Sequence, residues 1–225
     1  MILSIKRLIY ELKAKIRHNP LGEELKTLWD ADNYALHKHW HQAEFIVIDT
    51  ETTGLDPKHD TLLSIGWVVI KRGHIQLNSA QHIFIKVKEG VGNSATIHQI
   101  RDCELRQGME LHIAMSLLLN ALHNRIAVFH HAPMDLHFLN TLSKRLYNAP
   151  LLIPCVDTLA VEKQRHRHNE QSQSNGFFKL ATCRKRYNLP PHTGHNALTD
   201  AIATAELLLA QIAHKNDHVK TKELV

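Results

Sequence analysis

The chain has 225 residues, of which 44% are hydrophobic and 22% charged, and its formal net charge is +5. This composition excludes a largely disordered chain, and the length suffices for one core with a small appendage. No apolar run approaches the roughly 18 residues that span a bilayer. Lys6 and Arg7 interrupt the first apolar stretch, so no signal peptide is expected. The three scattered cysteines argue against a disulfide framework or a thiolate zinc site and favour the reducing cytoplasm.

The first predicted elements are helices. Isoleucine and leucine recur at spacings of three and four from Ile2 to Ile16, which predicts one amphipathic helix. Pro20 ends it, because the residue before a proline is pushed out of helical geometry. A second helical segment covers residues 21–29. We expect residues 1–42 to form an N-terminal helical extension that packs on the main domain or binds a protein partner. A basic membrane-surface helix is the less favoured alternative, and no membrane partner is expected.

From residue 44 onward the pattern becomes that of strands and then of alternating strands and helices. Residues 44–49 read as a strand, and residues 62–87 as two strands joined at Arg72-Gly73. Further elements follow: a helix around 108–124, a strand at 126–130, a helix from Pro133, a strand running into a helix over 151–159, and helices around 177–187 and 197–214. The order predicts a mixed α/β sheet with helices on both faces. The predicted domain covers residues 43–215, with a tail over 216–225, and the polar stretch 164–176 is predicted to be a mobile loop.

Positive charge is concentrated between Ser143 and Arg186. This segment holds nine Lys/Arg residues against three acidic ones, a net charge of +6. Such a segment suggests a polyanionic partner. A solvated, charged surface is an equally reasonable interpretation.

Two acids close the first strand. Side chains alternate along a strand, so Asp49 and Glu51 point to one face and Thr50 to the other. Two carboxylates on one face repel each other unless a cation lies between them. Taken alone, the pair is more often a strand that ends in a solvated acidic turn.

Two further aspartates are predicted in the first turns of helices. Asp135 follows Pro133, and Asp200 opens the helix over 197–214, positions that the helix dipole favours for a carboxylate without any catalytic role. His195 lies in the loop before Asp200. A loop histidine titrates near neutral pH and suits a general base, although with nineteen histidines in the chain it is equally a surface residue.

Three of these stretches, "DTETTG", "HHAPMDLHFL" and "HNALTDA", resemble in order and spacing the three motifs of the DEDDh family of 3′–5′ exonucleases, which includes the proofreading subunit of bacterial DNA polymerase III. The resemblance runs from Glu44 to His214, with "IHQI" (97–100) and "CVDTL" (155–159) as further landmarks. It implies a ribonuclease-H-like fold, and two divalent metal ions held by Asp49, Glu51, Asp135 and Asp200, with His195 as general base. It also implies substrate contacts from Thr52, Thr53, Gly54, Leu55 and His98.

The chemistry of the residues agrees with this resemblance. Four carboxylates without thiolates suit Mg²⁺ or Mn²⁺, and two such ions can cleave a phosphodiester bond. We therefore expect a 3′–5′ exonuclease that acts on single-stranded 3′ ends and releases nucleoside 5′-monophosphates, with DNA favoured over RNA. The alternatives are an exoribonuclease and a non-catalytic adaptor that binds nucleic acid. His131 and Met134 depart from the NAxFD pattern that is common in relatives, so substrate contacts there are not carried over.

Overall fold

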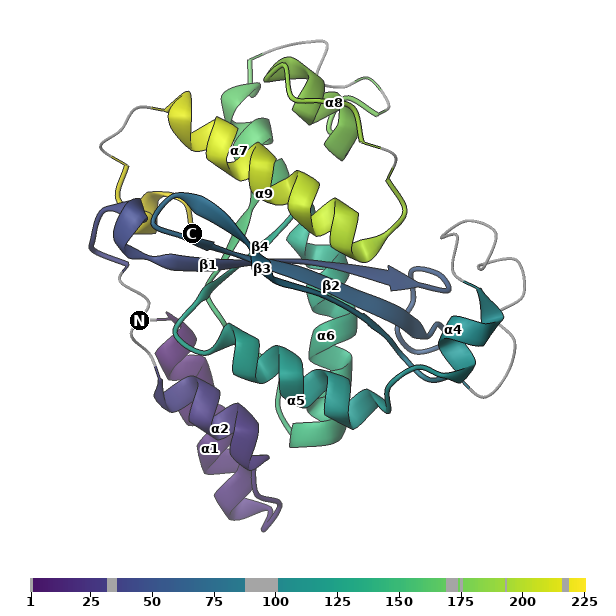
Figure 1. Cartoon of the computed structure of the whole chain (residues 1–225). Coiled ribbons are helices and arrows are strands. Elements are labelled where there is room, and N and C mark those ends of the chain that lie inside the picture. Colours follow the sequence, from purple (N-terminus) through teal and green to yellow (C-terminus); the bar gives the residue numbers. More distant parts are fainter. Residues whose placement is uncertain are drawn as a thin grey trace.

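The computed structural model describes residues 2–31, 36–87, 101–168, 174, 176–192, 194–215 and 219–225 (Figure 1). Its strands are β1 (Glu44–Thr52), β2 (Leu62–Lys71), β3 (His74–Phe84), β4 (Ile126–Phe129) and β5 (Cys155–Asp157). Its α-helices are α1 (Ile2–Ile16), α2 (Glu23–Asp30), α4 (Asp102–Arg106), α5 (Leu111–Leu122), α6 (Ala132–Tyr147), α7 (Thr158–Arg165), α8 (Leu180–Arg186) and α9 (Ala197–Ala213). Two short 3₁₀ helices are η1 (Trp40–Gln42) and η3 (Thr221–Glu223).

The five strands form one mixed sheet in the order β3-β2-β1-β4-β5. β1 pairs antiparallel with β2 and parallel with β4, so the sheet changes direction at β1. The hairpin between β2 and β3 turns at Arg72 and Gly73, whose φ angles are 51° and 74°. Positive φ at both central residues is the signature of a type I′ turn, the geometry that matches strand twist. The predicted mixed sheet and hairpin are both confirmed.

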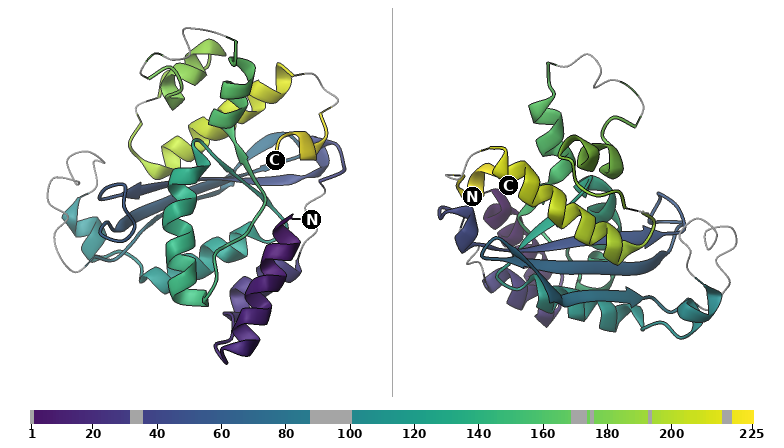
Figure 2. Two further views of the ribbon diagram at one scale, coloured as in Figure 1. Left: turned by 180° about the vertical axis from the view of Figure 1, so that it is seen from behind. Right: turned by 45° about the horizontal axis from the view of Figure 1, so that its top comes forward.

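Helices cover both faces of the sheet (Figures 1 and 2). Along β1, Phe45 and Val47 face one core, which contains the buried side chains of α9 together with Val219 and Leu224. Ile46 and Ile48 face the other core, which contains the buried side chains of α2, α5 and α6. The alternation along β1 therefore assigns odd-numbered side chains to the α9 face and even-numbered ones to the α6 face.

The N-terminus of α9 lies directly against β2. A Cβ added at Gly66 would stand 2.2 Å from the carbonyl carbon of Ala197 and 2.2 Å from the amide nitrogen of Leu198. Gly66 is also the cross-strand partner of Asp49. The missing side chain thus lets the start of α9 reach the end of β1 that carries the acids.

The two N-terminal helices are held differently. α2 buries Leu25, Leu28 and Trp29 in the core that α5 and α6 share. From α1 the side chain of Arg7 is buried, and its guanidinium donates to the carbonyl oxygens of Leu152 (2.9 Å) and Trp29 (3.1 Å). The apolar stripe of α1 stays exposed to solvent. No helix in the described ranges has both the length and the apolar character required to cross a membrane.

Candidate metal centre and active site

Three acids converge where β1 ends. Asp49 and Glu51 point to the α9 face, as their parity on the strand predicts, and Asp200 comes from the first turn of α9. One carboxylate oxygen from each of the three lies within 4.8 Å of the others. Residues 149 positions apart in the chain therefore form one cluster, because Gly66 lets α9 approach the sheet.

Asp135 approaches from the opposite face of the sheet. It lies in the first turn of α6, which begins immediately after His131, a residue with φ of 76°. The hydroxyl of Thr50 points to the α6 face and donates to Oδ1 of Asp135 at 2.7 Å. Asp135 is not one of the three acids whose oxygens lie within 4.8 Å of one another, but it is buried beside them. Sequence reasoning missed Thr50 as its partner, although strand parity already placed that side chain on this face.

Three acids of the site have raised pKa values. Burial, and then the charges of Asp135, Asp200 and Glu51, raise the pKa of Asp49 well above its ordinary value. Burial and the charges of Asp200 and Asp135 raise the pKa of Glu51 to about 8. Burial also raises the pKa of Asp135 to about 7, although the hydrogen bond from Thr50 opposes that rise. In the absence of a cation the cluster therefore retains protons near neutral pH.

Protein groups contact both oxygens of Asp200. Nε2 of His192 lies 2.6 Å from Oδ1, and the backbone N–H of His195 donates to Oδ2 at 2.8 Å. The loop achieves this through left-handed geometry at Gly194 (φ 44°) and His195 (φ 65°), after which Asn196 caps α9. Sequence reasoning singled out His195 and missed His192, which had no signal beyond being one more histidine.

The last residue of β1, Thr52, and the loop after it contain four of the five predicted substrate contacts. The hydroxyl of Thr52 donates to the carbonyl oxygen of Gly54 (2.6 Å), and that of Thr53 donates to Asp60 (3.1 Å). These bonds hold the loop in place and leave the side chain of Leu55 75% exposed. The fifth predicted contact, His98, lies outside the described residues, as does the landmark over 97–100.

The basic segment divides into two groups. Arg184 is buried and bonds to Glu206 and to the carbonyl oxygen of Ala203, while Arg186 binds the buried carboxylate of Glu162 at 2.9 Å. These two cations stabilise the fold. The other seven are exposed, and four of them lie on α7 and in the stretches between α7 and α8: Lys163, Arg165, Arg167 and Lys179.

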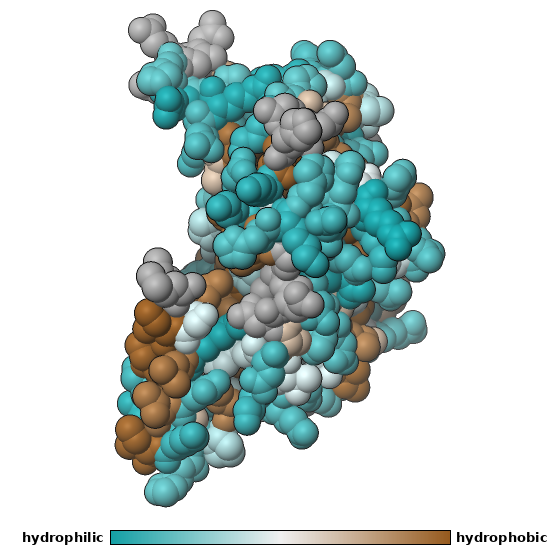
Figure 3. Space-filling view, turned by 90° about the vertical axis from the view of Figure 1, so that its left-hand side faces the viewer, coloured by the Kyte–Doolittle hydropathy of each residue, from teal (hydrophilic) through white to brown (hydrophobic). Residues whose placement is uncertain are grey.

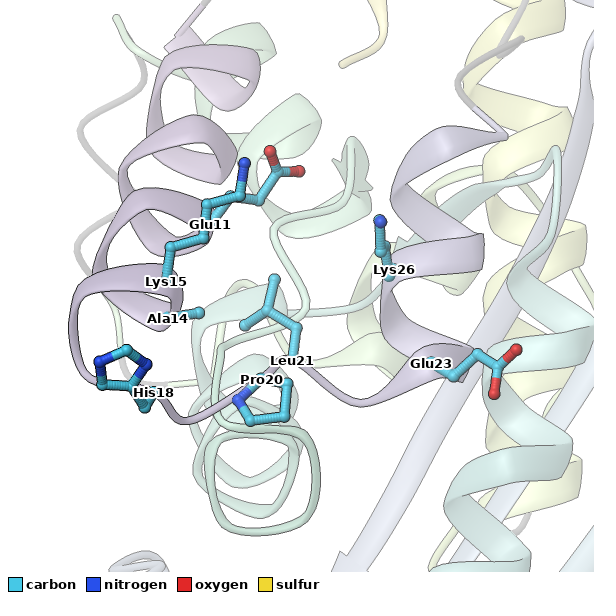
Figure 4. Close-up of a pocket in the computed structure, with 8 residues that line it drawn as sticks. All are labelled: Glu11, Ala14, Lys15, His18, Pro20, Leu21, Glu23 and Lys26. Atoms are coloured by element: carbon cyan, nitrogen blue, oxygen red, sulfur yellow. The ribbon is translucent and has the colours of Figure 1, made fainter.

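The donor set fits a hard divalent cation. Within the described residues, the cluster offers carboxylate oxygens alone, and crowded acids with raised pKa values are relieved by a cation. The three cysteines form no disulfide, and none belongs to the cluster. A separate cavity of about 580 Å³ lies between α1 and α2 and is lined by none of the acids named above (Figure 4).

Comparisons with known proteins show which family the chain resembles. Residues 46–208 match a family model described as RNase T exonuclease. The chain is 32% identical over 178 residues to the PolC-type DNA polymerase III of Thermotoga petrophila, covering 79% of the chain but only 12% of that relative. It is 26% identical over 189 residues to the DNA polymerase III subunit epsilon of Treponema pallidum, covering 80% of each.

Solved structures share the fold. Exonuclease I of E. coli in complex with a dT13 oligonucleotide has a TM-score of 0.63 at 16% identity, over 77% of this chain and 42% of that one. The cell-death related nuclease 4 has a TM-score of 0.63 at 12% identity, over 77% and 64%. The mixed sheet between helices is thus the fold of the ribonuclease-H-like exonucleases, as the sequence predicted.

Proposed function

The chain belongs to the RNase T exonuclease family, and on that premise we propose that it is a metal-dependent 3′–5′ exonuclease acting on DNA. It would hydrolyse phosphodiester bonds at single-stranded 3′ ends and release nucleoside 5′-monophosphates. The observation that carries this proposal is the cluster of Asp49, Glu51 and Asp200, whose oxygens lie within 4.8 Å of one another. Asp135, the fourth acid that the family resemblance implies, is buried beside them.

These four acids would hold two Mg²⁺ or Mn²⁺ ions. When bound, such ions activate the attacking water and stabilise the negative charge that develops on the departing 3′-oxygen. Other parts of the protein would hold these carboxylates in position. Thr50 orients Asp135 through a hydrogen bond, and the first turn of α9 orients Asp200. Because the charge of Asp49 interacts with those of all three other acids, we assign it the central position.

His195 would act as the general base. Its backbone N–H binds Asp200, so the residue is held at the edge of the acid cluster. Its side chain is exposed on a loop and can approach a water molecule near the acids. It would take one proton from that water as the water attacks phosphorus.

Nucleic acid would be held by the loop after β1 and by the exposed cations. Leu55, which follows Glu51 by four residues and is mostly exposed, would pack against the terminal base. Lys163, Arg165, Arg167 and Lys179 would contact phosphates. DNA is favoured over RNA because the relatives named above are DNA polymerase components, and one fold neighbour was solved with a DNA oligonucleotide. His98 would complete the substrate contacts.

We add three proposals to this function, on cellular location, on domain boundaries and on the role of the N-terminal extension. We place the protein in the cytoplasm, because its three cysteines are unpaired. We retain the division into an N-terminal helical extension (1–42), an exonuclease domain (43–215) and a tail (216–225). The extension is the candidate site for a partner other than nucleic acid.

The test uses single-stranded DNA and RNA of matched sequence, labelled at either end, with Mn²⁺, Mg²⁺ or EDTA. We expect nucleoside 5′-monophosphates from the 3′ end of DNA, no reaction in EDTA, and protection by a 3′-phosphorothioate linkage. Asp49→Asn should abolish activity, whereas Asp56→Asn, an exposed acid outside the cluster, should not. Faster cleavage of RNA would favour an exoribonuclease. Tight binding without cleavage would favour the non-catalytic adaptor.

A further inference from the structure

Helix α1 has two apolar faces, and only one of them meets the rest of the protein. Leu3, Arg7, Tyr10 and Ala14 are buried or half-buried on the inner face. The outer face carries a continuous aliphatic stripe that is exposed to solvent. Its exposed fractions are 53% for Ile5, 54% for Leu8, 43% for Ile9, 50% for Leu12 and 77% for Ile16. Five large aliphatic side chains in one exposed row are unusual for a protein that works alone in water.

The charges beside the stripe have one sign. On a helical wheel, Lys6, Lys13 and Arg17 follow one edge of the stripe. Lys15 follows the other edge, where it also lines the cavity between α1 and α2. All four are exposed. The acid of this helix, Glu11, is half-buried and turned toward the cavity between α1 and α2 (Figure 4). The outer face therefore presents aliphatic side chains bordered by cations.

The stripe lies on a projecting edge of the molecule. Seen from behind, α1 runs along the outside with no other element over it (Figure 2). The space-filling view shows a hydrophobic column along the lower edge with hydrophilic side chains next to it (Figure 3). A cavity of about 580 Å³ separates α1 from α2, so the helix is not packed along its whole length. Glu11, Glu23, Lys15 and Lys26 line this cavity with mixed charge and form no ligand site of their own.

We propose that the outer face of α1 binds the surface of an anionic lipid bilayer. A helix with an aliphatic face and a lysine-rich border lies in the plane of the lipid headgroups, with the apolar face buried and the lysine stems reaching to anionic lipids. Each cation close to such a surface adds to the affinity. The exposure of the stripe reverses our expectation from the sequence that no membrane takes part.

Two other occupants fit less well. A second copy of the chain would set lysines against lysines on either side of the paired stripes. A protein partner uses about 20–30 residues a side and favours Trp, Tyr and Arg as anchors. The stripe has five residues, all of them isoleucine or leucine. An anionic bilayer requires only an aliphatic helix face with cations beside it, and α1 has both.

This arrangement leaves the metal centre accessible. α1 belongs to the side of the sheet that α2 and α5 cover, whereas Asp49, Glu51 and Asp200 gather on the α9 side (Figure 1). A protein bound through α1 would therefore still present its acids to nucleic acid. The lipid proposal does not depend on the nuclease activity, and the two can fail separately.

The test is flotation of the full-length, nucleic-acid-free protein with vesicles in EDTA. One set of vesicles is phosphatidylcholine alone, and the other is phosphatidylcholine and phosphatidylglycerol in equal parts. We expect binding to the anionic vesicles only, weakening as salt rises. Leu8→Asp with Leu12→Asp should abolish it. Replacing all four bordering cations by glutamine should lower the partition coefficient by roughly a thousandfold.

Matched controls distinguish binding through the stripe from non-specific hydrophobic adsorption and from an effect of the total positive charge. Leu77→Asp changes an exposed leucine on β3 and should leave vesicle binding as it is. Glutamine at Lys163, Arg165, Arg167 and Lys179 removes the same charge elsewhere and should also leave vesicle binding largely intact. The α1 variants should keep the thermal melting curve and the nuclease activity of the parent, since the changed side chains are exposed.

Several outcomes would overturn the proposal. Absence of binding to anionic vesicles would do so, as would binding that survives the two aspartates on the stripe. Sedimentation equilibrium gives the third: a dimer that Leu8→Asp with Leu12→Asp dissociates would make a second copy the occupant of the stripe.

Discussion

The imidazole of His192 is hydrogen-bonded to one carboxylate oxygen of Asp200, with Nε2 2.6 Å from Oδ1. The other oxygen accepts the backbone N–H of His195 at 2.8 Å. Both oxygens of a carboxylate that we assign to the metal centre thus have partners within the protein. Each carboxylate oxygen has two lone-pair sites, and a cation that approaches Oδ1 from the side of His192 must displace the imidazole. His192 therefore competes with the metal for the same atom.

We expect His192→Ala to raise the affinity for Mn²⁺ by about three- to tenfold, because a hydrogen bond to a charged group contributes about 1.5–3 kcal/mol and only part of it is lost here. Isothermal titration with the metal alone measures this. His59→Ala is the matched control, since His59 makes a similar contact of 2.7 Å with Asp56 outside the cluster. Weaker Mn²⁺ binding in His192→Ala would mean that His192 supports Asp200 instead of competing with the ion.

The raised pKa values predict how stability depends on pH without metal. Glu51, with a pKa of about 8, and Asp135, with a pKa of about 7, bind protons more tightly in the folded protein than in the unfolded chain. Their stabilisation is complete below the ordinary carboxyl range and is lost as pH rises through the folded values. The free energy of unfolding in EDTA should therefore fall between about pH 4 and about pH 8, by several kcal/mol, because each such group contributes up to about 1.4 kcal/mol per pH unit.

Urea unfolding at a series of pH values checks this. Glu51→Gln should flatten the decline, and Mg²⁺ or Mn²⁺ should restore stability at high pH by relieving the crowded charges. Glu110→Gln, which changes an exposed acid paired with Lys86, should leave the pH dependence as it is. A native protein that gains stability over this range would contradict the raised pKa values.

His195→Ala should slow turnover by roughly 10²–10⁴-fold, the range for loss of a general base. Mn²⁺ affinity should change little, because the backbone N–H that binds Asp200 remains. The acidic limb of the pH–rate profile should also change shape, since the proposed proton acceptor has been removed. If that limb persists unaltered in the variant, the histidine takes no part in proton transfer. His168→Ala provides an exposed histidine as control.

The four exposed cations, Lys163, Arg165, Arg167 and Lys179, should act through phosphates and not through bases. Replacing all four with glutamine should weaken binding of single strands of every sequence alike. Each lost contact should reduce the slope of log affinity against log salt by about 0.7. A salt titration in Ca²⁺, which suppresses cleavage, measures the slope. Turnover at saturating substrate should stay nearly unchanged, and equal slopes for both proteins would reduce the four to a solvated surface.

Local patterns predicted much of this architecture. The alternation along β1 placed Asp49 and Glu51 on one face, and Pro133 placed Asp135 in a first helical turn, because both patterns depend only on backbone periodicity. The spacing of Ile5, Ile9 and Leu12 likewise predicted α1. The periodicity did not reveal that this stripe would remain uncovered, since that depends on how α1 packs in three dimensions.

The features that sequence reasoning missed arise from long-range packing. Thr50 and Asp135 are 85 residues apart and meet because α6 starts under β1. His192 gained significance only when the loop folded back on Asp200. Arg184 and Arg186 counted as part of a nucleic-acid surface until their partners, Glu206 and Glu162, became visible. Charge counts cannot distinguish a cation that holds the fold together from one that faces a ligand.

Gly66 has a consequence for how this site can vary. The gap between β2 and the start of α9 is narrower than a methyl group, so every other amino acid would push the helix away from the strand. Such a shift would carry Asp200 and the backbone N–H of His195 outward together, because both lie on the same turn of chain. The spacing between the acids of the proposed metal centre is thus set by a residue that is not itself one of the proposed ligands. The missing side chain of Gly66 thus fixes the distance between the sheet and the helix that carries Asp200.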